Sequence, residues 1–366
     1  MLSSGVSRRR RSLLLAVLAA LAAAPAGLAA QPASAGVNIT FDTPSPVSGV
    51  AGRLARPIGP ATRTTAGTPS DCLSRPTVTP LTGTYTTAYR GTPASGATVD
   101  ARGLVLAPAD GWVVVPGSAT NVCWVGGSYG LTVDDTASRS SYSASPRSAW
   151  SSIWHHNGGV TTKYGQSGWI WDGVSISHVG DAFNISDGSN DFEIRNSHLS
   201  DVRDDCVQND KFLAGAVRDS FLDGCYVAFS ARASGKVPDG SANTWTVTGN
   251  IVWVRPMWSV YKGDSPGNGE IFKWDKANLA KTPKLVFRDN IVRVGRTPFQ
   301  TGSKQGSFYV PPGTDFANNV LVWDGPGTPP PSLTKWFDAA HGSRVGTMAD
   351  WDAAVAAWRA AHPGVA

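Results

Sequence analysis

The chain has 366 residues, of which 41% are hydrophobic and only 16% are charged, and its formal net charge is +5. This composition excludes collagen, a coiled coil and a wholly disordered chain, and the length allows a sizeable core. The low charge and the many Gly, Ser, Thr, Val and Asn residues favour short strands and turns over long helices.

Residues 1–35 have the features of a secretory signal peptide. Arg8 to Arg11 form a charged segment, Leu13 to Leu21 form an apolar one, and Ala33-Ser34-Ala35 is a small-residue cleavage site. The end of the arginine run also fits a twin-arginine signal loosely, with ordinary Sec export as the alternative. We therefore expect a secreted, extracellular protein.

Removal of this leader takes away four arginines and no acid, so the net charge falls from +5 to +1. No basic tract remains that would bind nucleic acid, and no later segment is long and apolar enough to cross a membrane. We therefore expect no nucleic-acid or membrane partner, and a monomer.

The exported chain keeps an even number of cysteines, which predicts two disulfides without fixing which pairs form. None lies in a Cys-x-x-Cys pair, and His155-His156 offers no metal-ligand spacing, so no zinc site is predicted. The four are Cys72, Cys123, Cys206 and Cys225.

A repeat runs through the centre of the chain, after an arm or linker at residues 36–71 that is rich in Thr, Pro, Gly and Ser. Each unit has a polar pair of Asn, Asp, Gly or Ser followed by apolar or β-branched residues. The steps between units start at 23 residues and lengthen to 30, 40 and 29. The shared apolar position falls at Ile176, Leu199, Leu222, Val252, Val292 and Leu321.

Short strands with Asn and Gly corners at this period predict an all-β fold, a right-handed parallel β-helix, over residues 72–330. The corner amides should hydrogen-bond to one another as a ladder. The two longest steps predict loops at 232–243 and 262–283, and loops of this size on a solenoid often form a binding face.

Residues 331–366 predict a C-terminal segment with a short helix. Thr347 and Asp350 have capping-box spacing, and Trp351, Val355 and Trp358 recur at helical spacing. We expect this helix to cover the open end or the flank of the solenoid, with a partner-binding helix as the alternative.

The candidate catalytic residues are Asp181, Asp204 and Asp205. Asp204 follows Asp181 by 23 residues, so the two should stack at roughly one strand spacing, about 4.8 Å. Like charges that close must be offset by a proton, a cation or a reaction, and different surroundings can make one an acid and another a base. Asp187 and Asp210 have the same spacing and are interpreted as corner residues.

This region resembles the polygalacturonase family of right-handed β-helix glycosidases. Asp181 matches the Asp of its Asn-Thr-Asp-Gly motif, and Asp204-Asp205-Cys206 matches its Gly-Asp-Asp-Cys motif one coil later. The resemblance implies Asp205 as general acid, with Asp181 and Asp204 activating water in an inverting hydrolysis. It also supports a Cys206–Cys225 disulfide, which leaves Cys72 to pair with Cys123.

Basic residues near this cluster are candidates for binding the substrate. They are Arg203, Arg232 and Lys262, of which Lys262 lies nearest to a match for the family's Arg-Ile-Lys motif, with Arg255 and Lys273 as further possibilities. Such a cation could bind an acidic sugar or serve as the base of a lyase. Tryptophans such as Trp169, Trp171, Trp253, Trp258 and Trp274 could stack on sugar rings, although packing in the core is the simpler interpretation.

The sequence therefore predicts an extracellular polysaccharide-acting protein, a glycoside hydrolase ahead of a lyase. No cofactor is required, but the Asp cluster would also suit Ca²⁺, which would fit a calcium-dependent lyase. The alternative class is a non-catalytic glycan-binding or surface scaffold β-helix, because the family's Gly-His-Gly motif has no counterpart after Cys225.

Overall fold

The computed structural model describes residues 71–132, 157–233, 235–255, 270–295 and 309–365. The predicted leader, residues 36–70 of the arm, His155-His156, Trp258 and Lys262 lie outside these ranges. Every described residue belongs to one compact unit. Among the described helices, none has the length and apolar character needed to cross a membrane.

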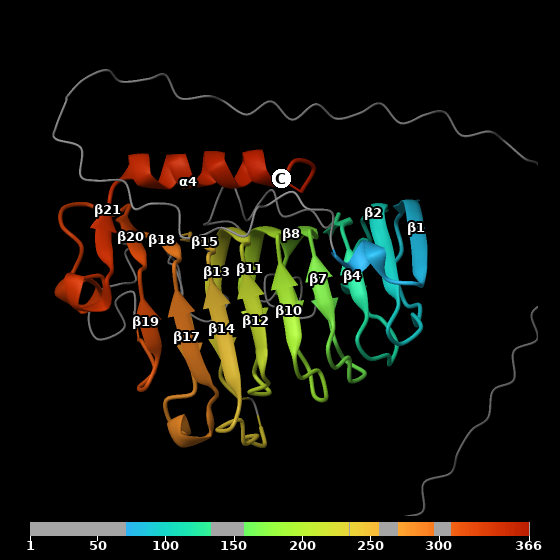
Figure 1. Ribbon diagram of the computed structural model, residues 1–366, viewed down its shortest axis with the longest axis horizontal. Coiled ribbons are helices and arrows are strands. Elements are labelled where there is room, and N and C mark those ends of the chain that lie inside the picture. The colour runs from blue at the N-terminus through green and yellow to red at the C-terminus, as the bar shows by residue number, and fades with distance from the viewer. Residues whose placement is uncertain (1–70, 133–156, 234, 256–269, 296–308, 366) are drawn as a thin grey trace, which may run out of the picture. The chain divides into compact units, whose positions relative to one another are not determined.

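The described part of the chain forms 21 strands whose pairings are all parallel, in a solenoid-like β architecture (Figure 1). Successive strands stack into three columns that we number in the order in which the chain enters them. Column 1 contains β1 (Val78–Tyr85), β2 (Thr98–Leu106), β4 (Cys123–Val125), β7 (Ile170–Asp172), β10 (Phe192–Arg195), β12 (Gly215–Arg218), β14 (Thr244–Thr248), β17 (Lys284–Arg288) and β19 (Asp315–Ala317).

Column 2 contains the second halves of β1 and β2 and the strands that follow the corner after column 1. Its further members are β5 (Ser128–Gly130), β8 (Ser175–Val179), β11 (His198–Gln208), β13 (Phe221–Ala231), β15 (Ile251–Val254), β18 (Ile291–Val294), β20 (Val320–Trp323) and β21 (Arg344–Gly346). Column 3 contains β3 (Trp112–Val114), β6 (Gly158–Thr161), β9 (Phe183–Asn184), the ends of β11 and β13, and β16 (Phe272–Trp274).

The predicted repeat register is confirmed in column 2. Ile176 pairs with Leu199, and the line continues without a slip through the other four predicted positions. It extends further than the sequence indicated, to Tyr129 before the first of them and to Val345 after the last. The solenoid therefore reaches beyond residue 330, and the predicted loop at 262–283 contains the column 3 strand β16.

The corner between columns 1 and 2 uses the same device in coil after coil. A residue with positive φ, such as Asp289 (58°) or Asn318 (57°), turns the chain, and the next side chain points inward and is buried. Asn319 Oδ1 accepts from the backbone N–H of Asn290 at 2.9 Å, and Asn290 Oδ1 accepts in the same way from Asn250. The predicted amide ladder is thus present, with Ser220 at one end and Ser343 at the other.

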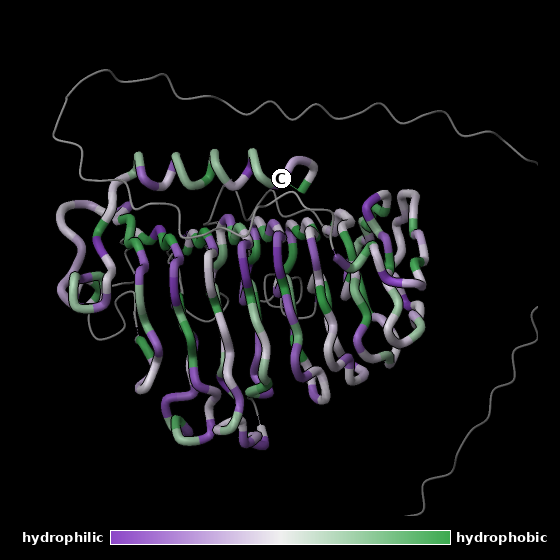
Figure 2. Tube along the Cα trace, in the orientation of Figure 1, coloured by the Kyte–Doolittle hydropathy of each residue, from purple (hydrophilic) through white to green (hydrophobic). Residues whose placement is uncertain are grey.

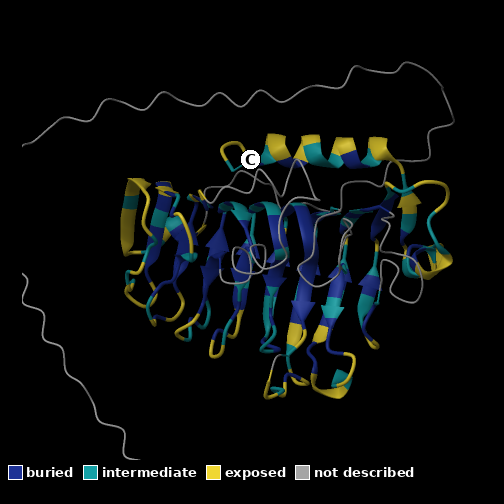
Figure 3. Ribbon diagram, turned by 180° about the vertical axis from the view of Figure 1, so that it is seen from behind, coloured by how far each residue is buried: buried dark blue, intermediate teal, exposed yellow. Residues whose placement is uncertain are grey.

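The interior is apolar and largely aromatic. Hydrophobic and hydrophilic residues alternate along many strands (Figure 2), and the strands are mostly buried while many turns are exposed (Figure 3). Trp169, Trp171 and Trp274 are buried in this core, as the packing interpretation predicted, whereas Trp253 is only half-buried and lies against the guanidinium of Arg293 at 4.3 Å.

Helix α4 (Met348–Ala361) begins at the predicted capping box of Thr347 and Asp350. Its buried Trp351 and Trp358 pack against Phe221 and other apolar residues on the outer face of column 2, so the helix covers the flank of the solenoid (Figure 1). The remaining helical turns are short: η1 (Asp71–Ser74), η2 (Leu279–Lys281), α3 (Pro331–Thr334) and η3 (Ala339–His341).

Both disulfides expected from the sequence are present, Cys72–Cys123 and Cys206–Cys225. The second pair required a turn, because Cys225 aligns with Val202 and not with Cys206. The structure has that turn, since the pairing of β11 with β13 is irregular between Val202 and Asp205.

Candidate active site

The three candidate aspartates lie at the corner between columns 2 and 3. In column 2, β11 follows β8 at an offset of 23 residues, with Val202 opposite Val179. In column 3 the offset from β9 is 24, with Val207 opposite Phe183. One additional residue is therefore accommodated at this corner of β11, and the regular alternation of side chains is broken there. This is how the adjacent Asp204 and Asp205 both reach one lysine.

Lys273 of β16 is that lysine. Its Nζ donates to both carboxylate oxygens of Asp205, at 2.7 and 3.0 Å, and lies 3.9 Å from Asp204 Oδ1. Asp181 Oδ1 accepts from the backbone N–H of Asp205 at 3.0 Å. Each aspartate places one oxygen within 4.8 Å of the other two. The corner thus holds three acidic groups and one base.

The four side chains differ in exposure. Asp205 is fully buried, whereas the side chains of Asp204 and Lys273 are 22% and 16% exposed, and Asp181 is also partly exposed. Asp181 and Asp204 therefore reach the surface of the corner, and Asp205 lies beneath them.

Burial and crowding shift the acid–base properties of this cluster. Burial, then repulsion from Asp204 and Asp205, raises the pKa of Asp181 well above its usual value. Burial and the charge of Asp205 raise the pKa of Asp204 to about 7, although Lys273 and Arg232 oppose the shift. Burial alone would lower the pKa of Lys273, but Asp205 and Asp204 outweigh it and raise that pKa.

A further acidic residue of the β11 coil, Asp210, is held by hydrogen bonds. It accepts from Ser230 Oγ at 2.7 Å, from the backbone N–H of Arg232 at 2.9 Å and from Gln208 Nε2 at 3.2 Å. Asp187 instead contacts Lys211 at 3.2 Å and is 80% exposed. Asp187 thus lies apart from the three aspartates, whereas the charge of Asp210 acts on them and helps to raise the pKa of Asp204 and of Lys273.

The predicted substrate-binding cations occupy different positions. Arg232 is exposed and close enough to Asp204 to act on its charge, whereas Arg203 is only 2% exposed. Lys262 lies outside the described residues. Arg255 reaches back over Gly224, whose missing side chain leaves room for the guanidinium, and forms an ion pair with Asp201.

The sequence indicates Lys273 only as one of several cations that could bind the substrate. The signal that could have identified it is weak, because β16 has three residues and falls inside the 40-residue step between Val252 and Val292. Only the column 3 pairing, in which Lys273 lies opposite Ser230, brings it to the aspartates.

The oxygen atoms of the three aspartates would suit Ca²⁺ by their chemistry. However, the ammonium of Lys273 already lies between Asp204 and Asp205 and supplies the compensating positive charge. A divalent ion there would have to displace Lys273 or repel it. The donor set therefore does not fit a resident calcium ion.

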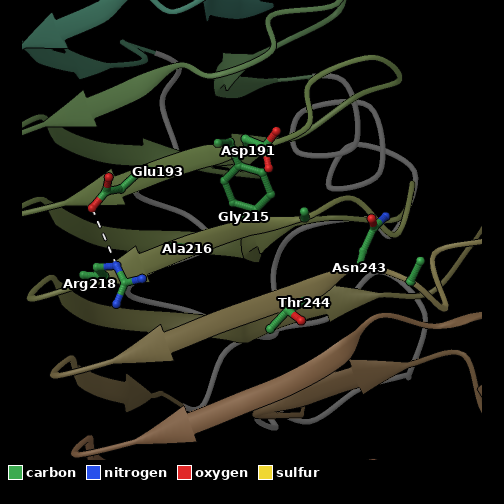
Figure 4. A pocket seen from close by; sticks show the side chains of 10 residues that line it. Asp191, Glu193, Gly215, Ala216, Arg218, Asn243 and Thr244 are labelled. Atoms are coloured by element: carbon green, nitrogen blue, oxygen red, sulfur yellow. Dashed lines mark ion pairs between the residues drawn. The ribbon is translucent and has the colours of Figure 1, made fainter.

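A separate shallow groove of about 390 Å³ lies on the outer face of column 1 (Figure 4). Its floor is formed by small residues of β12, including Gly215 and Ala216, and an ion pair of Glu193 with Arg218 (3.6 Å) lies at one side. It belongs to β10, β12 and β14 and contains none of the three candidate aspartates.

Comparisons with known proteins do not assign this chain to a family. No protein-family model, curated protein or solved structure matches it. The class defined here is therefore that of the fold, a parallel β-helix-like solenoid with two disulfides.

Proposed function

We propose that this protein is an exported polysaccharide hydrolase whose acid and base are Asp181 and Asp204. The observation that supports the proposal is the convergence of Asp181, Asp204, Asp205 and Lys273 from three coils at one corner, with two of the carboxyls partly exposed. Two carboxyl groups in unequal surroundings are the usual machinery of glycoside hydrolysis. The two disulfides are consistent with export.

The roles follow from the unequal surroundings. Asp204 lies nearer to the cations Lys273 and Arg232, which favour its carboxylate form, so it ionises first and serves as base or nucleophile. The pKa of Asp181 is raised well above its usual value, so Asp181 keeps its proton and serves as the acid. Asp205 is fully buried and engaged by Lys273, which suits a positioning role better than the acid role that the resemblance implied.

The spacing of the acid and the base bears on the stereochemistry. Inverting pairs are typically roughly 6.5–9.5 Å apart and retaining pairs about 5–5.5 Å. The nearest oxygens of Asp181 and Asp204 lie within 4.8 Å, which favours direct attack by Asp204 over the inversion that the resemblance implies. Nuclear magnetic resonance of the first product would distinguish the two outcomes by its anomeric configuration.

Two observations argue against the lyase alternative. The raised pKa of Lys273 keeps it protonated, which makes it a poor base for proton abstraction. The same ammonium occupies the place of the calcium ion that a calcium-dependent lyase would use.

The test is a screen of the mature protein on plant, algal and bacterial polysaccharides, with reducing ends and unsaturated products measured separately. On the substrate found, Asp204→Asn should lower turnover about 10²–10⁴-fold. Asp187→Asn is the matched control, because Asp187 is exposed and outside the cluster, and it should keep full turnover. Full turnover of folded Asp204→Asn would refute the proposal, and saturable binding without any product would favour the non-catalytic alternative.

A further inference from the structure

The Lys273–Asp205 contact has a second chemical consequence, independent of any polysaccharide. The amine nitrogen faces the Asp205 carboxyl group, with both oxygens within 3.0 Å of Nζ. Asp205 is fully buried, and the two residues belong to hydrogen-bonded strands of different coils, β11 and β16. A nucleophile and a carbonyl held this close by a rigid frame gain much of the advantage of an intramolecular reaction.

We propose that Lys273 and Asp205 form an intramolecular isopeptide bond after folding. The Nζ lone pair attacks Cγ of Asp205, a new N–C bond forms, and the C–OH bond breaks. The hydroxyl leaves with a proton as one water molecule, and the second proton lost by the nitrogen returns to a neighbouring carboxylate. The product is a secondary amide, and no oxidant, reductant or cofactor is consumed.

The neighbouring acids supply the proton transfers that this condensation needs. Asp204 Oδ1 lies 3.9 Å from the same nitrogen, and Asp181 Oδ1 accepts from the backbone N–H of Asp205. Burial and mutual repulsion favour the protonated forms of both acids, so a proton for the leaving hydroxyl is at hand near neutral pH.

Lys273 is protonated at rest, because Asp205 and Asp204 raise its pKa. The reactive form arises when one proton moves from Nζ to Asp205 along their hydrogen bond of 2.7 Å. This requirement makes the step slow, so we expect the bond to accumulate with time in the folded protein.

The bond would join two coils that are not neighbours. Gln208 of β11 pairs with Ser230 of β13, and Ser230 pairs with Lys273 of β16, so the link would pass over the coil between them. It would close a loop between residues 68 positions apart and hold the irregular corner in place.

The test is mass spectrometry of tryptic peptides from the full mature protein, reduced and alkylated, at increasing times after folding. Linked protein should give residues 204–211 joined to residues 263–276, with a mass lower by one water molecule than the sum of the two. Trypsin would not cut at a linked Lys273. Recovery of residues 204–211 and 263–273 only as separate peptides, even after long incubation of folded protein, would overturn the proposal.

Matched variants separate the chemistry from chance proximity. Lys273→Met should abolish the linked peptide, and Asp204→Asn should slow its appearance; an unchanged rate in Asp204→Asn would refute the part assigned to that acid. The pair of Lys211 with Asp187 is an internal control, because it has a similar N–O distance, 3.2 Å, but is exposed. It should stay unlinked, and a link there as well would show that burial and neighbouring acids are not what drives the reaction.

Discussion

The two corners that flank column 2 both hold buried polar side chains, but those of one corner are neutral and those of the other are charged. Between columns 1 and 2, the corner is closed by buried neutral amides that hydrogen-bond from coil to coil, as Asn250, Asn290 and Asn319 do. Between columns 2 and 3, stacked coils bring Asp181, Asp204 and Asp205 together, and a lysine from a third coil compensates them. The first corner repeats and serves stability, whereas the second interrupts the repeat and concentrates charge.

The charged corner should be the more sensitive of the two to loss of a single side chain. Compared with freshly folded wild type, in which the ion pair is intact, Lys273→Met removes the ammonium that faces the fully buried Asp205. Breaking a buried ion pair from one side typically costs about 3–5 kcal/mol of the free energy of unfolding. Denaturant unfolding would measure this. Lys211→Met, which breaks an exposed pair, should change stability by less than about 1 kcal/mol. Equal effects of the two substitutions would show that the corner does not depend on charge compensation.

The amide corner should respond almost as strongly. Asn290→Ala leaves the Asn250 amides and the Val247 carbonyl without the partners that Asn290 now supplies. Each buried unsatisfied group costs about 1–3 kcal/mol, so we expect a loss of roughly 2–4 kcal/mol in unfolding free energy. Asn190→Ala is the control at an exposed position and should be nearly neutral. If Asn290→Ala left the free energy of unfolding unchanged, the ladder would accompany the turn without stabilising it.

Activity should depend on pH through the charged corner. Because Asp204 must be ionised to act as nucleophile or base and its pKa is raised to about 7, kcat/KM should increase between pH 5 and 8 with a midpoint near 7. At higher pH it should decrease when Asp181 loses its proton. A profile that is flat across pH 7 would remove Asp204 from the base role.

The smallest effect is the pH dependence of stability. Unfolded Asp ionises near pH 3.9, whereas Asp204 in the folded protein keeps its proton until about pH 7. Folding is therefore favoured below pH 4 by this group, and its contribution is lost as the pH rises from about 4 to 7, by roughly 2 kcal/mol after allowance for its exposed fraction. Wild type should lose more stability than Asp204→Asn over this interval; parallel curves would contradict the raised pKa.

Sequence reasoning succeeded where the structure is periodic. Six apolar positions of the repeat and the capping box at Thr347 were predicted, because each depends on a short local pattern. The two disulfide pairs were predicted from the family resemblance, which supported Cys206–Cys225 and left Cys72 to pair with Cys123. The charged corner was predicted only in part. Asp181, Asp204 and Asp205 were identified, but the burial of Asp205 and the approach of Lys273 depend on one additional residue in β11 and on a three-residue strand inside a long step. Neither the additional residue nor the short strand is marked by a local sequence pattern.

Helix α4 affects the order in which the chain can complete its fold. It starts beside β21 at the last coil and returns along the flank, where Trp358 Nε1 donates to the carbonyl of Asp219, and Val365 beyond its end lies next to Gly173. Solenoids usually fray from their terminal coils, since each coil contacts only its neighbours. Here the final coils are tied to the middle of the stack by a helix that follows every described strand in the chain. The outer face of column 2 would thus stay uncovered until this helix docks, and removal of residues 347–366 would loosen coils far from the cut.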